Sequence, residues 1–197
     1  QSGLENILTK YTFEKFEVSE NWQKVLKSKA IEFAQKAEKW FFIGGCTGAG
    51  KTHLCTAIAG EFLKQQKAVK YMLWRDDVVK LKSNVNDSEE YARLISDLKN
   101  AEVLYIDDLF KTGKNDEGKP QRPTVADINI AFEILNYRCN NDNLITIISS
   151  ECTLYNILDI DEAVGGRISE KAFQSGYGFN ITPDRSKNYR LKNVIDL

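Results

Sequence analysis

The sequence lacks three features that often define a protein's class: an excess of one charge, paired cysteines and a long hydrophobic run. Its 27 lysine and arginine residues against 28 aspartate and glutamate residues leave a formal charge of −1. No global positive field therefore attracts nucleic acid or an anionic membrane, and any such binding has to come from a local patch. The apolar runs, such as residues 40–43, are far shorter than the roughly 20 residues of a membrane-spanning helix, so we expect no membrane partner.

The four cysteines lie far apart and form no Cys-x-x-Cys pair, which argues against a zinc site or a disulfide framework. This usage fits a reducing compartment, so we expect a cytoplasmic protein. The start of the sequence, residues 1–3, has neither an initiator Met nor the regions of a signal peptide. We therefore expect the 197 residues to be part of a longer protein.

What is present is enough apolar sequence, 42% of the residues, for the core of one domain. Residues 1–18 show no helical period and are interpreted as an arm or linker. Helical periodicity begins at Ser19 and lasts for about 18 residues. Short apolar runs then alternate with helical patterns, which predicts a parallel sheet covered by helices on both faces. The expected strands are 40–44, 68–74, 103–106, 144–148 and 178–182, and the expected helical stretches include 75–100, with a break at 83–87, and 153–173.

A complete phosphate-binding motif, Gly-x-x-x-x-Gly-Lys-Ser/Thr, follows the first expected strand and opens a helix. In this position successive backbone N–H groups and the positive helix end surround phosphates. Lys51 would reach the β- and γ-phosphates, and the Thr52 hydroxyl would bind Mg²⁺. The motif consists of Gly45, Cys46, Thr47, Gly48, Ala49, Gly50, Lys51 and Thr52.

Two adjacent carboxylates, Asp107 and Asp108, end the third expected strand. Neighbouring strand residues point in different directions, so the two acids can have different roles. We expect Asp107 to hold Mg²⁺ through its water shell and Asp108 to polarise the attacking water. A pair of solvated acids is the alternative, and the phosphate-binding motif makes it the weaker one. ATP is favoured over GTP because no guanine-reading Asn-Lys-x-Asp sequence is present.

In this order the motifs resemble those of the AAA+ ATPase domain of DnaC/DnaI-type replicative helicase loaders, with IstB-like ATPases as close relatives. The resemblance covers roughly residues 12–192 and rests on the segments 45–52, 103–108, 146–150, 166–168 and 188–191. It implies a three-layer α/β P-loop fold with a five-stranded parallel sheet, an N-terminal linker and no separate helical lid. The ATPase domain would then occupy residues 19–197.

The resemblance also assigns roles to single residues. Arg167 matches the arginine finger that completes a neighbouring subunit's ATP site, and Arg190 matches an arginine that senses nucleotide in its own subunit. Ser150 is the expected sensor at the end of the fourth strand, because Glu151 stands where relatives often carry Asn. We also expect His53, directly after the motif, to be a cofactor-binding residue, although its position in a first helical turn favours packing over catalysis. Phe13 and Phe16 correspond to a linker segment near the base.

The activity implied by the resemblance is that of a Mg²⁺-dependent ATPase that assembles on single-stranded DNA and delivers the replicative helicase. Its partners would be the helicase, bound through an upstream region, the DNA and further copies of itself. Lys80, Lys82 and Lys111 are the candidate DNA contacts, together with Lys114 and Lys119 in the positive loop. An IstB-like transposition helper and a weakly hydrolysing ATP-switch adaptor stay open as alternatives. A small-molecule phosphotransferase is disfavoured, since the 111–122 loop makes a poor arginine-rich lid.

Overall fold

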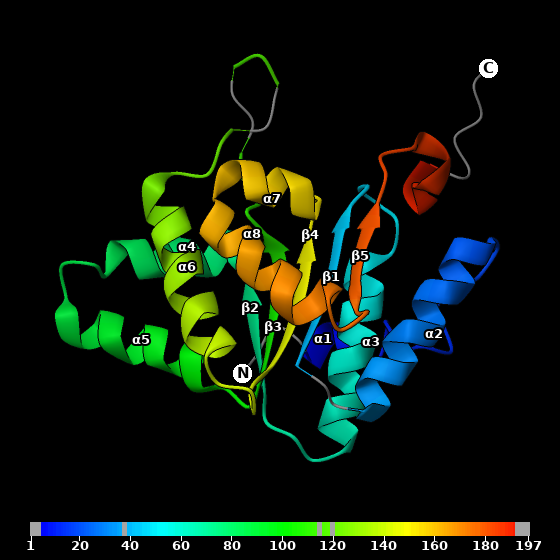
Figure 1. Cartoon of the computed structure of the whole chain (residues 1–197), viewed down its shortest axis with the longest axis horizontal. Coiled ribbons are helices and arrows are strands. Elements are labelled where there is room, and N and C mark those ends of the chain that lie inside the picture. Colours follow the sequence, from blue (N-terminus) through cyan, green and yellow to red (C-terminus); the bar gives the residue numbers. More distant parts are fainter. Residues whose placement is uncertain (1–4, 37–38, 114–115, 119–120, 192–197) are drawn as a thin grey trace.

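The protein is built around a five-stranded parallel sheet with the strand order β2-β3-β4-β1-β5 (Figure 1). The structure is a computed structural model that describes residues 5–36, 39–113, 116–118 and 121–191 of the chain. The strands are β1 (Trp40–Gly45), β2 (Val69–Leu73), β3 (Val103–Leu109), β4 (Ile145–Ser150) and β5 (Gly178–Ile181). Each neighbouring pair is parallel, so all strand carboxyl ends lie at one edge.

Helices cover both faces of the sheet, which confirms the three-layer α/β fold predicted from the sequence. One layer contains α1 (Glu5–Leu8), α2 (Asn21–Lys36) and α3 (Lys51–Lys64). The other contains α4 (Trp74–Ser83), α5 (Ser88–Asn100), α6 (Val125–Cys139), α7 (Leu154–Ile160) and α8 (Glu162–Ile168). No helical lid domain stands apart from this core in the part of the chain that the structure describes. Among the described residues, no helix is both long and apolar enough to cross a bilayer.

The continuous apolar run of β1 follows from its burial on both faces. Trp40 and Phe42 point into the core beneath the α4–α8 layer, whereas Phe41 and Ile43 belong to the core beneath α2 and α3. All four side chains are at most 1% exposed. A strand with helices on both sides cannot alternate apolar and polar residues, since neither of its faces meets water.

The segment interpreted as an arm packs against the body of the domain. It contains the short helix α1 and buries Phe13 and Phe16 in the core beneath α3. The Nε2 atom of His53, on α3, lies 2.8 Å from the carbonyl oxygen of Thr12. The N-terminal segment is thus fixed beside the first turn of α3.

Two expected elements differ in detail from the structure. Trp74, expected at the end of a strand, begins α4. The stretch 153–173, expected to be helical throughout, is broken at Asp161, where the backbone is extended and the side chain accepts a hydrogen bond from the N–H of Val164 at 2.8 Å. This acid caps α8, and a π-helical turn (Ser169–Phe173) follows that helix.

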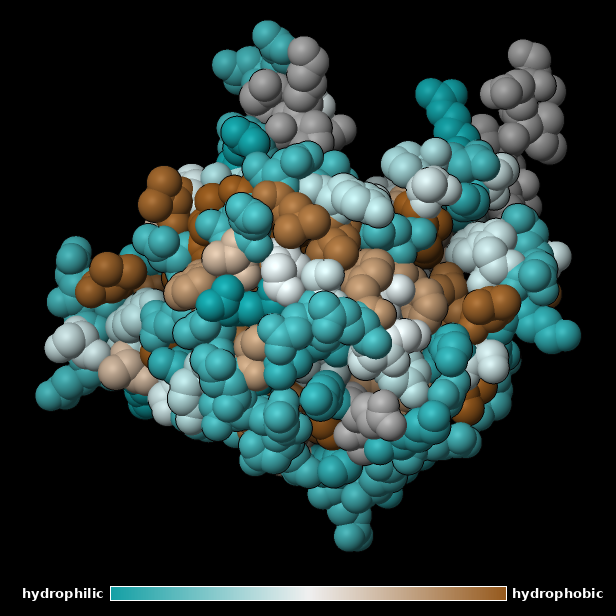
Figure 2. All heavy atoms as spheres, viewed as in Figure 1, coloured by the Kyte–Doolittle hydropathy of each residue, from teal (hydrophilic) through white to brown (hydrophobic). Residues whose placement is uncertain are grey.

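Several hydrophobic side chains stay exposed on α6 and α7. Val125 and Phe132 on α6 are 73% and 36% exposed, and Tyr155 on α7 is 71% exposed. Figure 2 shows hydrophobic residues gathered over α7 in the upper part of this face, which is otherwise largely hydrophilic. We refer to Val125, Phe132 and Tyr155 as the α6–α7 patch.

One buried arginine joins three elements at the edge of the sheet opposite the strand carboxyl ends. The side chain of Arg138, on α6, is fully buried and makes no ion pair among the described residues. Burial lowers the pKa of its guanidinium to about 10, so the group stays charged at neutral pH. It donates hydrogen bonds to the hydroxyl of Thr146 and to the carbonyl oxygens of Leu98, Lys99, Ala101 and Ile145, at 2.6–3.1 Å. The end of α5 and the start of β4 are held together in this way.

Replacing Arg138 by Met should therefore lower the free energy of unfolding by about 3 kcal/mol or more, because several buried carbonyl groups lose their donor. Urea denaturation measures this value. The matched control is Arg93→Met on α5, whose side chain is 59% exposed and pairs with Glu90. The control should change stability by less than about 0.5 kcal/mol. Equal effects of the two substitutions would show that the Arg138 hydrogen bonds do not stabilise the fold.

Candidate nucleotide-binding site

A pocket of about 280 Å³ lies at the carboxyl edge of the sheet, where the loop after β1 enters α3. Three parts of the chain line it: the N-terminal segment, the phosphate-binding loop with the ends of β3 and β4, and the C-terminal 3₁₀ turn (Tyr189–Leu191). Ligands of open parallel sheets bind at this edge, since the loops at the strand carboxyl ends surround the crevice there. The lining residues are Tyr11, Lys15, Phe16, Glu17, Thr47, Gly48, Gly50, Lys51, Thr52, His53, Asp108, Lys111, Glu151, Tyr189 and Arg190.

Two glycines give the phosphate-binding loop its shape. Gly48 and Gly50 have φ angles of 75° and 83°, in the left-handed region that other residues adopt only at a cost. A Cβ atom on Gly50 would lie 2.8 Å from the ring of Phe16. The loop therefore depends on glycine for its backbone and for the close approach of the N-terminal segment.

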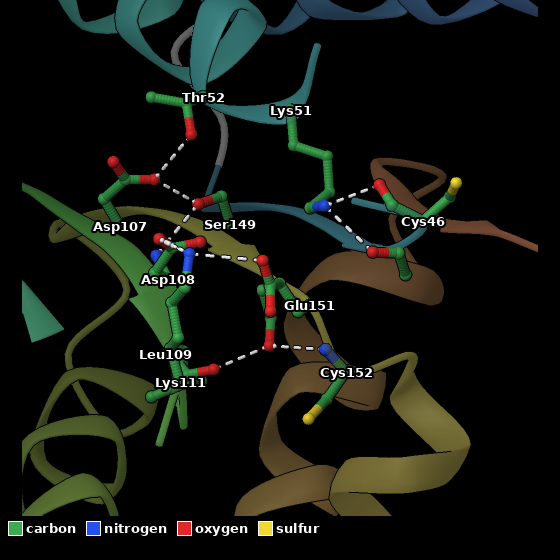
Figure 3. Close-up of polar contacts among 12 residues, drawn as sticks. Cys46, Lys51, Thr52, Asp107, Asp108, Leu109, Lys111, Ser149, Glu151 and Cys152 are labelled. Carbon is green, nitrogen blue, oxygen red and sulfur yellow. Dashed lines mark hydrogen bonds and ion pairs between the residues drawn. The ribbon is translucent and has the colours of Figure 1, made fainter. Parts of the chain in front are cut away.

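The ammonium group of Lys51 is held inside this loop. Its Nζ atom donates to the carbonyl oxygens of Gly45 and Cys46 at 2.9 and 2.8 Å (Figure 3). Burial lowers the pKa of Lys51, and the carboxylates of Glu151 and Asp108 oppose that shift. Lys51 thus lies at the pocket, as expected from the sequence, and provides a largely desolvated positive charge there.

The carboxylate of Asp107 accepts hydrogen bonds from three hydroxyl groups, which come from three different elements. Its Oδ1 accepts hydrogen bonds from Thr52 Oγ1, at 3.1 Å, and from the hydroxyl of Ser149 on β4. Its Oδ2 accepts from the phenol of Tyr71 on β2 at 3.1 Å. Burial and the charge of Asp107 raise the pKa of Tyr71, so the phenol remains a donor. The pair Thr52 and Asp107 offers the hard oxygen atoms that Mg²⁺ takes from a protein when phosphates supply further ligands.

Asp108 points away from Asp107 and forms a different set of contacts. Its carboxylate binds Lys111 Nζ at 2.8 Å, and the same ammonium lies 3.2 Å from Glu151 Oε1 (Figure 3). Its backbone N–H donates to the Ser149 hydroxyl at 3.0 Å. The two neighbouring acids thus face different groups, as the strand geometry predicts.

Aromatic side chains form the opposite wall of the pocket. The ring of His53 lies 5.0 Å from that of Tyr11 and 5.2 Å from that of Phe16, centroid to centroid. Burial lowers the pKa of His53, which favours a neutral imidazole at pH 7. Tyr189 closes this wall, since its N–H donates to the carbonyl of Gly48 at 3.0 Å and its hydroxyl donates to the carbonyl of Glu17 at 2.9 Å.

Most of the predicted binding residues lie at this pocket, including Thr47, Arg190 and His53. Ser150 does not. Its hydroxyl is buried and donates to the carbonyl of Leu109 at 2.7 Å, so it joins β4 to β3 instead of facing a ligand. The hydroxyl of the preceding residue, Ser149, donates to the Asp107 carboxylate and accepts a hydrogen bond from the N–H of Asp108. Side chains one residue apart on a strand face opposite sides, so the sequence alone does not show which of the two adjacent serines meets Asp107.

The candidate DNA contacts are spread over different environments. Lys82 on α4 pairs with Asp127 on α6 at 2.8 Å, and Lys80 pairs with Asp77 at 2.8 Å while remaining 67% exposed. Lys111 was expected on a DNA-binding surface and instead lines the pocket. Lys114 and Lys119 lie outside the described residues.

Arg167 lies on α8, away from the pocket of its own chain. Its guanidinium is 4.5 Å from the ring centroid of Phe132 on α6. It donates to Asn136 Oδ1 at 2.9 Å and to the carbonyl of Ala163 at 2.7 Å. These contacts hold the side chain beside the α6–α7 patch.

The substitution Gly50→Ala should lower the free energy of unfolding by about 1–3 kcal/mol, because it places a side chain at positive φ and against Phe16. Urea denaturation measures the change. Gly166→Ala on α8 is the matched control, because a Cβ atom there meets no atom within 4 Å and alanine favours a helix by up to about 1 kcal/mol. A Gly50→Ala protein as stable as the wild type would contradict the geometry described for the loop.

Comparison with known proteins gives a family and a set of relatives. The family model described as IstB-like ATP binding protein matches residues 4–155. The uncharacterized protein YqaM of Bacillus subtilis (strain 168) is 40% identical over 149 residues, which are 75% of this chain and 44% of YqaM. The replicative helicase loader DnaC of Buchnera aphidicola is 27% identical over 114 residues, 55% of this chain and 46% of that protein. The chain thus spans just under half the length of these relatives.

Solved structures share the fold. A crystal structure of the DnaC helicase loader superimposes with a TM-score of 0.71 at 18% identity, covering 90% of this chain and 98% of that one. The replication initiator DnaA bound to AMPPCP and single-stranded DNA gives a TM-score of 0.67 at 19% identity, covering 91% of this chain and 51% of that one. With a family model matched over more than half of its length, and with a P-loop AAA+ fold, the chain belongs to the IstB-like ATP-binding protein family.

Proposed function

We propose that the protein binds ATP with Mg²⁺ in this pocket and hydrolyses it. The observation that carries the proposal is the contact of Thr52 Oγ1 with Asp107 Oδ1, at 3.1 Å, beside the desolvated ammonium of Lys51. When bound, Mg²⁺ neutralises charge on the phosphate oxygens and orients them.

The chain's own residues have separate tasks in this proposal. Lys51 binds the β- and γ-phosphates, while the loop and the N-terminus of α3 surround the phosphates with N–H groups. Asp107 and Thr52 hold the metal, and Ser149 fixes Asp107 and the backbone of Asp108 in place. Asp108 orients the attacking water and accepts a proton from it.

Substitution of Lys51 by Ala should weaken ATP binding roughly 100-fold, since a hydrogen bond from a charged donor contributes about 1.5–3 kcal/mol. Titration calorimetry with ATP and Mg²⁺ measures the affinity. Lys64→Ala is the control on the same helix, because Lys64 is 66% exposed and pairs only with Glu61 among the described residues. The site is assigned wrongly if the Lys51→Ala protein keeps wild-type affinity.

We further infer a role in DNA replication, as a helicase loader that assembles on single-stranded DNA and delivers the replicative helicase. The replicative helicase loader DnaC of Buchnera aphidicola is the relative that supports this role. The chain spans under half of that protein, and the helicase is a proposed partner of the whole protein. Lys80 is the candidate DNA contact best placed for the role, since its side chain is the most exposed of the three.

Nucleotide-dependent self-association would give Arg167 its function as an arginine finger. A guanidinium matches the charge that spreads over the transferring phosphate oxygens, and such a residue accelerates hydrolysis by about 10³-fold or more. Two features support a position at a subunit interface. Arg167 stacks on Phe132, and Phe132 belongs to the exposed α6–α7 patch.

Mixing two inactive variants tests this arrangement. The Lys51→Ala subunit keeps Arg167 but binds ATP only weakly, and the Arg167→Ala subunit binds ATP without a finger. The mixture should hydrolyse ATP faster than either variant alone, because the finger of one subunit completes the site of the other. Steady-state phosphate release measures the rates. A mixture that is no faster than the sum of its parts would contradict a finger acting between subunits.

A transposition helper ATPase is the second candidate function, and the match to the IstB-like family model favours it. The two functions share the ATP site and differ in their partners. The full-length reading frame separates them, because an N-terminal helical or zinc-binding domain before this ATPase domain favours the loader. A slow ATP switch, the third possibility, is recognised by a turnover that stays low with and without single-stranded DNA.

A further inference from the structure

The ammonium group of Lys111 is bound by two carboxylates inside the nucleotide pocket. It lies 2.8 Å from Asp108 Oδ2 and 3.2 Å from Glu151 Oε1. Asp108 ends β3 and Glu151 directly follows β4, so one lysine joins the ends of two neighbouring strands. All three side chains line the pocket together with Lys51 and Thr52 (Figure 3). We call these three residues the Lys111 bridge.

A strained turn directs Lys111 into this position. Asp108 and Phe110 have φ angles of 59° and 61°, and a left-handed conformation costs a residue other than glycine roughly 1–2 kcal/mol. The turn is closed by a hydrogen bond from the N–H of Lys111 to the carbonyl of Asp108 at 2.9 Å. Phe110 is 3% exposed and packs edge-on against Trp74 at 5.5 Å. Burial of Phe110 thus holds a backbone that brings Lys111 back over Asp108.

The charges beside the phosphate-binding loop indicate a role for Lys111. Figure 3 shows Lys51 and Lys111 beside the carboxylates of Asp107, Asp108 and Glu151. The other charged residues that line the pocket are Lys15, Glu17 and Arg190. A carboxylate repels a phosphate oxygen unless a cation stands between them. Burial acts to lower the pKa of Lys111, but the contacts with Asp108 and Glu151 outweigh it and raise that pKa. Lys111 is therefore a charged donor that separates Glu151 from an incoming phosphate.

We propose that Lys111 binds the γ-phosphate of ATP and thereby makes the pocket distinguish ATP from ADP. The proposal rests on the ATP site described under Proposed function. With ADP, the ammonium stays on Asp108 and Glu151. With ATP, it turns to the γ-phosphate oxygens, and the carboxylate of Asp108 becomes free to orient water. The buried hydroxyl of Ser150 makes no such contact, so the Lys111 bridge takes over the sensing role expected of that residue.

The test compares the affinities for ADP and for a non-hydrolysable ATP analogue, each with Mg²⁺, in variants of Lys111. Lys111→Ala should reduce the preference for the ATP analogue over ADP by roughly 10-fold or more, since a charge-assisted hydrogen bond is lost. ADP affinity should change by less than about 3-fold, which is within the range of an altered surface charge. ATP turnover should fall as well. Lys64→Ala, which removes another lysine paired with an acid three residues earlier, should leave both affinities unchanged.

A double variant with unchanged net charge distinguishes a direct contact between Lys111 and the γ-phosphate from simple neutralisation of Glu151. Lys111→Ala combined with Glu151→Gln removes one positive and one negative charge, so the net charge of the pocket equals that of the wild type. The proposal expects the ATP preference to stay low in this variant, because no ammonium reaches the γ-phosphate. A preference restored to the wild-type value would overturn it and leave Lys111 as a counter-charge to Glu151.

The remaining outcomes are equally decisive. Faster turnover of Lys111→Ala would overturn the proposal, since the lysine would then restrain Asp108 without contacting phosphate. An unchanged ratio of the two affinities in Lys111→Ala would also overturn it, while leaving the ATP site itself intact. A wild-type protein that binds neither nucleotide would overturn both the proposed function and the role of Lys111.

Discussion

A buried carboxylate is stable only when hydrogen-bond donors surround it, and the phosphate end of this protein is organised around one such group, Asp107. The side chain is 4% exposed and takes hydroxyl groups from Thr52, Ser149 and Tyr71. These donors come from α3, β4 and β2, so satisfying one acid fixes the mutual position of three elements. The P-loop and the sheet are therefore fixed relative to each other by a single constraint. The hydrogen bond of Ser149 with the Asp108 backbone extends that constraint to the second acid.

Those parts of the site that are contiguous in sequence were predictable. The segment 45–52 contains the turn, the lysine and the start of the helix in one continuous stretch. The apolar run before Asp107 likewise predicts where that strand ends. The fold was predictable for a similar reason, since strands buried on both faces cannot alternate in polarity. The apolar run of β1 is the clearest example.

The parts that sequence reasoning missed depend on a register or on a backbone angle. Ser149 and Ser150 are chemically identical, and only the facing of β4 decides which of them meets Asp107. Lys111 was expected among the DNA contacts, because nothing in the sequence reports that Asp108 and Phe110 adopt left-handed angles. Charge patterning likewise could not reveal that Lys82 holds Asp127. Each of these residues makes a contact with a residue that is distant in sequence.

The contacts of Tyr189 have a consequence for the order in which the protein matures. This residue binds the carbonyl of Gly48 in the phosphate-binding loop and the carbonyl of Glu17 in the N-terminal segment, so the two ends of the described chain meet at one wall. Synthesis on the ribosome proceeds from the N-terminus, and domains generally fold as units. Because this wall needs residue 189, it can be completed only after nearly all of the described chain has been synthesised.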